Sequence, residues 1–140
     1  MHQTVPLALE NTTRTQPPRL PYRALVSETL GEYYDLTLVF VGDTRSRTLN
    51  KTYRGKDAPA SVLSFPLEDG VGEIYLALPV ARRRALRYGG STRTAVAHYL
   101  IHGMLHLKGY VHGSTMDEYE TEIARSFGIT LPPATESPVD

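Results

Sequence analysis

The sequence predicts an α+β fold, in which a single domain packs a mixed sheet of about four strands against four or five helices. The first observation is the order of hydrophobic patterns along the chain: two strand and helix pairs, then two consecutive strands, then helices alone. The second is the length, because 140 residues ordinarily build one core. We therefore expect one domain over residues 1–131, followed by a disordered tail over residues 132–140.

Composition agrees with a globular domain and limits the side chains that could bind a transition metal. Hydrophobic residues make up 41% of the chain and charged residues 21%, a balance typical of soluble proteins. The chain has no cysteine, so a transition metal would have to be bound by histidines and carboxylates. No basic segment followed by a sustained apolar stretch opens the chain, and no run of ~18 apolar residues occurs in it. We expect a cytoplasmic protein with no membrane partner.

The N-terminal half alternates strands and helices. Residues 4–10 alternate apolar and polar side chains, which predicts a strand, and Pro6 indicates an edge position. The proline-rich residues 11–21 predict a loop, and the apolar spacing over residues 21–33 predicts a helix. The apolar run over residues 36–41 then predicts a buried strand.

A second helix and two further strands follow. Asp43 is a candidate N-cap for a helix over residues 43–54, and Gly55 suits the left-handed position after its end. Residues 61–66 and 73–78 predict two strands joined by an acidic turn.

The C-terminal half is predicted to be helical. Pro79 opens an arginine-rich helix over residues 79–88, and Ser91 or Thr92 can cap the central helix over residues 92–107. A final helix over residues 114–127 begins at a possible capping box made by Ser114 and Asp117.

Charge is unevenly distributed although the formal net charge is zero. Residues 44–56 hold five basic side chains and residues 82–93 hold five arginines, with no acid in either stretch. From residue 117 onward there are six acids and one arginine. This polarity predicts a face suited to phosphates, and the alternative is ordinary solvated helix faces.

Three histidines at the end of the central helix predict a metal site. His102 and His106 are four residues apart, so both imidazoles project from one face of a helix. Gly109 allows the chain to turn, and His112 then supplies a third nitrogen, leaving a fourth position open as in catalytic zinc sites. The alternative is two hydrogen-bonded core histidines and a surface His112. His98, one turn earlier, is interpreted as packing or supporting the ligands.

The spacing of the three histidines also occurs in metzincin peptidases, whose glutamate after the first histidine is the general base. Here that position is Gly103. A peptidase mechanism of that kind has therefore lost its base.

Three strings, in this order, resemble the YbeY family of metal-dependent endoribonucleases, which act in ribosomal RNA maturation: LNKTYRGKDAPASVLSFP, GEIYLAL and HGMLHLKGYVH. The resemblance runs from about residue 36 to 127. It implies that the three histidines hold one zinc ion per chain and that a cleft beside it receives single-stranded RNA. It also implies that Arg54 contacts the substrate as a catalytic residue, and that the ribosome or its small subunit is a partner. No DNA partner is expected.

Further RNA contacts are expected close to these residues. Lys51 and Lys56 are predicted to attract phosphates, with a solvated surface as the alternative. Tyr53 and Tyr110 are candidates for stacking on unpaired bases, with a place in the core as the alternative for each. The predicted RNA contacts are therefore Lys51, Lys56 and Tyr110.

The sequence departs from the family pattern at Val111, where the family usually has aspartate before the third histidine, and at Ala60, Ser61 and Glu73. Loss of an acidic neighbour would weaken metal binding or slow the reaction. No general base is assigned, because the acids after the third histidine fit a solvated helix face: Glu118, Glu120 and Glu122. Two alternatives stay open, a zinc peptidase-like hydrolase and a non-catalytic, ribosome-associated binding module.

Overall fold

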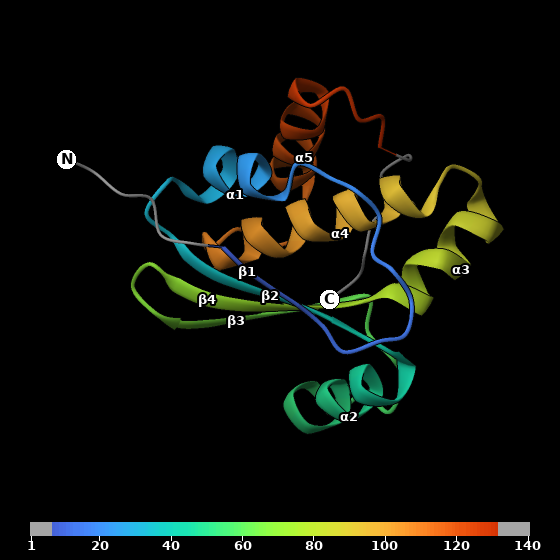
Figure 1. Ribbon diagram of the computed structural model, residues 1–140. Helices are drawn as coiled ribbons and strands as arrows, with labels where there is room; N and C mark the ends of the chain where they lie inside the picture. The colour runs from blue at the N-terminus through green and yellow to red at the C-terminus, as the bar shows by residue number, and fades with distance from the viewer. Residues whose placement is uncertain (1–6, 132–140) are drawn as a thin grey trace.

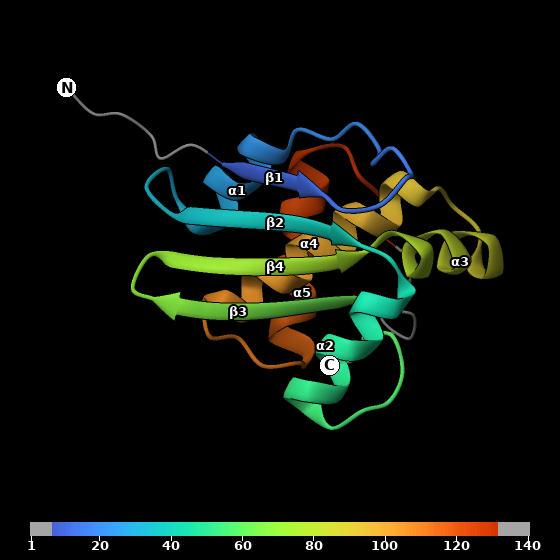
Figure 2. The ribbon, with the colours of Figure 1, turned by 60° about the horizontal axis from the view of Figure 1, so that its bottom comes forward.

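A four-stranded mixed sheet organises the chain, in a computed structural model that describes residues 7–131. Its strands lie in the order β1, β2, β4, β3 (Figure 2). The strands are β1 (Ala8–Asn11), β2 (Asp35–Val41), β3 (Val62–Glu68) and β4 (Val71–Ala77). β2 pairs in parallel with both β1 and β4, whereas β3 pairs with β4 in an antiparallel hairpin. The predicted mixed sheet is confirmed.

Within the described residues, five helices accompany the sheet: α1 (Tyr22–Leu30), α2 (Asp43–Arg54), α3 (Leu78–Tyr88), α4 (Thr92–Leu107) and α5 (Ser114–Ser126). Figure 1 shows α1, α4 and α5 on one face of the sheet and α2 on the opposite side. The α+β fold class and the order of elements agree with the sequence prediction. No helix in the range 7–131 is long and apolar enough to cross a membrane.

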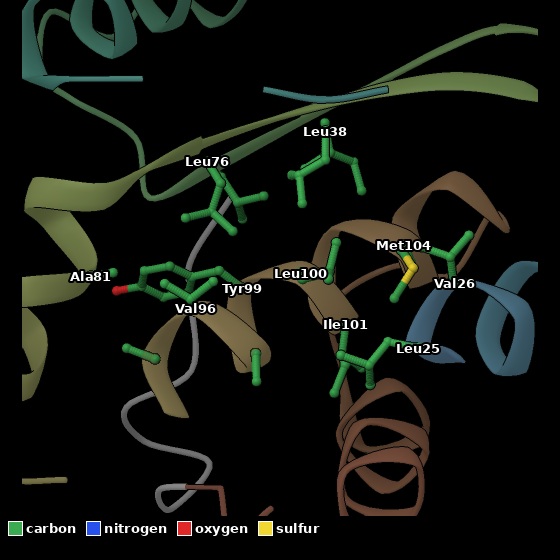
Figure 3. Close-up of a cluster of buried hydrophobic side chains, with 14 of the residues drawn as sticks. Leu25, Val26, Leu38, Leu76, Ala81, Val96, Tyr99, Leu100, Ile101 and Met104 are labelled. Atoms are coloured by element: carbon green, nitrogen blue, oxygen red, sulfur yellow. The ribbon is translucent and has the colours of Figure 1, made fainter. Parts of the chain in front are cut away.

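The core lies between the sheet and α4. Leu38 and Leu76 point from the strands toward α4, and Leu25 of α1 lies beside Ile101 (Figure 3). Every residue of α4 from Ala95 to Leu105 is buried, because the sheet, α1, α3 and α5 all contact this helix. A helix enclosed on all sides holds its side chains in fixed directions, which suits it to position a site.

Helix caps were predicted less well than helix positions. Ser91 caps α4 as expected, since its side-chain oxygen accepts a hydrogen bond from the Thr94 N–H at 3.0 Å. The Asp43 prediction was wrong: Gly42 is the N-cap of α2, and the Asp43 carboxylate pairs instead with Arg83 at 2.8 Å. The capping box predicted at Ser114 is also absent, because Gly113 is the N-cap of α5 and no side chain caps it.

Several element ends differ from the prediction, among them those of β1 and α1. β1 covers Ala8–Asn11 rather than residues 4–10, and it does lie at the edge of the sheet. α1 ends at Leu30, three residues early, because Gly31 has a φ of 98° that breaks the helix. Residues 4–6 and the tail predicted over residues 132–140 lie outside the described part of the chain.

Candidate metal centre

His102 and His106 form a close pair on one face of α4. Their ring centroids are 4.6 Å apart and their Nε2 atoms 3.0 Å apart. His102 is fully buried, at 0% exposure, whereas His106 is partly buried. Residues four apart on a helix share a face, and the enclosed packing of α4 fixes the direction of both rings.

The other nitrogen of each ring has its own partner. His102 Nδ1 lies 2.8 Å from Glu120 Oε1, and His106 Nδ1 lies 2.9 Å from the backbone carbonyl oxygen of Tyr110. Burial raises the pKa of Glu120, but hydrogen bonds from His102 and His98 outweigh burial and lower the pKa to about 2. An ionised carboxylate and a carbonyl only accept hydrogen bonds, so both Nδ1 atoms carry the ring proton.

It follows that both Nε2 atoms present lone pairs to the same point. Two neutral acceptors 3.0 Å apart repel each other, and a cation between them, a proton or a metal ion, removes that repulsion. Two nitrogen ligands of a tetrahedral zinc lie about 3.3 Å apart when each Zn–N bond is about 2.0–2.1 Å. The spacing and the tautomers of His102 and His106 therefore fit a zinc site.

His112 lies near this pair but not close enough to share a metal ion with it. Gly109, with a φ of 97°, ends the helical path, and His112 follows on the exposed segment before α5. The ring centroid of His112 is 6.2 Å from that of His102. Among residues 7–131 no three histidine or carboxylate side chains are close enough to hold a metal ion together. The three-histidine site stays a prediction, of which the structure brings two members together.

Gly103 faces the sheet rather than the space beside the histidines. A Cβ atom at this position would lie 3.0 Å from Ser64 Oγ and 3.0 Å from Val62 Cγ2. The Ser64 hydroxyl also donates to the Gly103 carbonyl at 2.8 Å. Residue 103 therefore has no room for a catalytic glutamate, which argues against the peptidase alternative.

Arg54 ends α2 and reaches toward β3, where its Nη2 lies 3.5 Å from the Val62 carbonyl oxygen. The Val62 side chain packs on Gly103, the neighbour of His102. Arg54 thus lies at the strand that contacts the part of α4 bearing His102, and Figure 2 shows α2 at the β3 edge of the sheet.

The predicted RNA contacts have different surroundings. Lys51 and Lys56 are exposed near the end of α2. Tyr110 is partly buried, with its ring centroid 5.1 Å from that of Tyr119. Tyr53 is 64% exposed with its ring against Phe65, so its alternative place in the core is wrong.

The sequence missed Glu120. This acid was interpreted as part of a solvated face, yet it is 1% exposed and contacts two histidines. A signal was present, because Met116, Glu120 and Ala124 are spaced four apart and together form the buried stripe of α5. Arg84 of α3 also differs from expectation. Its side chain contacts His98 instead of lying on the predicted phosphate-binding face.

Comparison with protein families gives a match over residues 11–127 to the model of the family described as endoribonuclease YbeY. Three curated relatives carry that name. The protein of Pelotomaculum thermopropionicum is 37% identical over 76% of this chain and 76% of its own length. The proteins of Geobacillus kaustophilus and Burkholderia ambifaria are 33% and 37% identical, each over 80% of this chain and over 85% and 73% of their own lengths.

A solved structure shares the fold. The solution structure of a Thermotoga maritima protein matches with a TM-score of 0.57 and 23% identity. The match covers 87% of this chain and 91% of that one. At this identity the likeness concerns the arrangement of the strands and helices alone.

Proposed function

Because the chain belongs to the YbeY family of endoribonucleases, we propose that it cuts single-stranded RNA with one zinc ion per chain, held by His102, His106 and His112. The observation that carries the metal assignment is the pair of Nε2 atoms 3.0 Å apart, with the Nδ1 atom of each ring engaged by another partner. His112 is an exposed side chain on the following turn, with its ring centroid 6.2 Å from that of His102, and the proposal requires its ring to turn toward the pair.

Different residues of the chain position the histidines and contact the phosphate. When bound, zinc supplies Lewis-acid polarisation of the phosphodiester and activation of water. Glu120 and the Tyr110 carbonyl hold the two rings so that Nε2 faces outward. Arg54 donates charge-assisted hydrogen bonds to the phosphate oxygens, on which negative charge increases in the transition state.

Binding of the RNA strand uses the surface around the end of α2. Lys51 and Lys56 attract phosphates without reading sequence. Tyr110 offers a ring for stacking on an unpaired base, beside Tyr119. The stacking contact favours a single strand, whose bases are accessible, whereas the attraction to phosphates acts on any RNA.

The biological substrate proposed is ribosomal RNA during maturation, with the ribosome or its small subunit as partner in the cytoplasm. The support is family membership together with the basic end of α2. The net charge of zero means that attraction to RNA has to come from such a local patch.

The test is cleavage of a single-stranded RNA oligonucleotide by the purified protein, with and without a zinc chelator. We expect the chelator to abolish cleavage and added zinc to restore it. His112→Ala should lose both cleavage and tight zinc binding. Arg54→Met should keep its zinc and still lose about 10²-fold or more in rate, because its hydrogen bonds act on the reacting phosphate.

Three results would contradict the proposal in different ways. Cleavage by metal-free His112→Ala would rule out metal catalysis. Hydrolysis of casein without hydrolysis of RNA would favour the peptidase alternative. RNA binding by the zinc-loaded protein without any cleavage would favour the ribosome-associated binding module.

A further inference from the structure

A chain of four polar side chains runs through the interior from α3 to the candidate metal centre. Arg84 Nη2 lies 2.9 Å from His98 Nδ1, His98 Nε2 lies 3.4 Å from Glu120 Oε2, and Glu120 Oε1 lies 2.8 Å from His102 Nδ1. Glu120 and His98 are each 1% exposed. The four side chains come from α3, α4 and α5, so this hydrogen-bonded series connects three helices to His102.

With Glu120 ionised, the contacts from Arg84 to His102 Nδ1 are satisfied by one arrangement of protons. Arginine always donates, so the His98 nitrogen beside Arg84 must accept, and the ring proton of His98 sits on Nε2. That proton is donated to Glu120, whose second oxygen accepts from His102 Nδ1. This series of contacts, which begins at Arg84, therefore favours the His102 tautomer with its proton on Nδ1 and its Nε2 directed at His106.

We propose that Arg84 and His98 are positioning residues, which act through Glu120 to fix the ring and the tautomer of His102. The inference rests on the metal-binding role of His102 in the proposed function. Without a donor at residue 84, His98 can place its proton on Nδ1 and turn a lone pair toward the Glu120 carboxylate. Two acceptors then face each other, and the carboxylate loses one of the two hydrogen bonds that hold it.

Arg84 is anchored for this role. Its guanidinium carbon lies 5.1 Å from the centroid of the Tyr99 ring, a cation–π contact beside His98 on α4. The neighbouring Arg83 points outward and pairs with Asp43, with side chains 56% and 43% exposed. Arg83 and Arg84 are thus adjacent arginines on one helix, and only Arg84 contacts the chain that leads to His102.

The experiment compares Arg84→Met with the matched control Arg83→Met, which removes the same charge from the same helix. The first readout is the zinc dissociation constant, measured by competition with a chelator. We expect it to rise about tenfold in Arg84→Met and to stay at the wild-type value in Arg83→Met, since residues that support a ligand histidine typically change metal affinity 10–100-fold. Arg84→Lys, which keeps a donor, should recover part of the loss.

The second readout needs no metal. Long-range nitrogen NMR of the metal-free protein at pH 8 reports which ring nitrogens carry protons. We expect His102 protonated on Nδ1 and His98 on Nε2 in the wild type and in Arg83→Met, and a mixture of tautomers in Arg84→Met. Glu120→Gln has nearly the same volume but offers only one acceptor, so it should disturb the two histidines most and weaken zinc binding by 10–100-fold.

Two results would overturn the proposal: His102 protonated on Nε2 in the wild type, or Arg84→Met equal to Arg83→Met in both readouts. The wild-type spectrum decides even if Arg84→Met fails to fold. A wild type with the expected tautomers but no affinity for zinc would overturn the proposed function instead, which keeps the two failures distinguishable.

Discussion

His102 is the central side chain of the candidate site, because each of its ring nitrogens has a specific partner. It is fully buried, its Nδ1 contacts Glu120 and its Nε2 faces His106. The 2.8 Å contact with the Glu120 carboxylate places the ring proton of His102 on Nδ1. The direction of the lone pair is thus set before any ion arrives, which reduces the cost of binding one.

Gly103, the next residue, gives the first prediction. Gly103→Ala places a methyl group 3.0 Å from Ser64 Oγ and from Val62 Cγ2, where α4 meets β3. We expect the free energy of unfolding to fall by about 1–3 kcal/mol, the usual cost of overpacking a core. Urea denaturation measures it.

Gly42→Ala is the control for this prediction. A Cβ atom at Gly42 meets nothing within 4 Å, and its φ of −89° suits any residue. The same added methyl group should therefore cost less there than at Gly103. Equal stability of Gly103→Ala and the wild type would mean that α4 and β3 are not packed as closely as described.

The residues of the site could be predicted from the sequence only in part. The spacing of His102 and His106 is a helix pattern that needs no structure to interpret. Glu120 could not be assigned in the same way, because acids are rarely buried and an acidic helix normally faces solvent. The Tyr110 contact is made by a backbone carbonyl, on which the side-chain identity gives no information.

At the scale of elements, helix positions were predicted better than helix caps. α4 was predicted over its full length, because Gly89 and Gly90 precede a long stretch of mostly apolar residues, and the strands around it are short apolar runs. Caps depend on one hydrogen bond, for which several nearby side chains compete. Asp43 illustrates this, since its carboxylate bonds to Arg83 of α3 instead of to the start of α2.

The contact between α2 and α3 predicts a pH dependence. A hydrogen bond from Arg83 lowers the pKa of Asp43, so the pair stabilises the fold above the ordinary aspartate pKa, and that contribution is lost as pH falls through the lowered value. Both side chains are largely exposed, so Asp43→Asn should cost only about 0.2–1 kcal/mol at pH 7. The difference from wild type should vanish by pH ~2–3; urea denaturation at both pH values measures it.

A double-mutant cycle provides the control. In an Arg83→Met background, Asp43→Asn should have little effect at either pH, because the hydrogen-bond partner is already gone. An equal loss of stability in both backgrounds would assign the effect to the start of α2 rather than to its contact with α3.

At the scale of the molecule, the basic surface is smaller than the sequence indicates. Arg47 pairs with Asp57, Arg83 pairs with Asp43, and Arg84 faces the interior. The exposed lysines near the end of α2 are the predicted phosphate contacts beside Arg54. The predicted phosphate-binding region therefore lies at the β3 edge of the sheet. The histidine pair lies on α4, which also contacts β3.

The measurement that tests the central claim most directly is zinc K-edge X-ray absorption of the purified protein loaded with one zinc per chain. We predict three imidazole nitrogens at about 2.0–2.1 Å and one further light atom, with one imidazole lost in His112→Ala. Zinc bound by fewer than two imidazoles, or bound through the Glu120 carboxylate, would contradict the account, because His102 and His106 would then not direct their Nε2 atoms at a common ion.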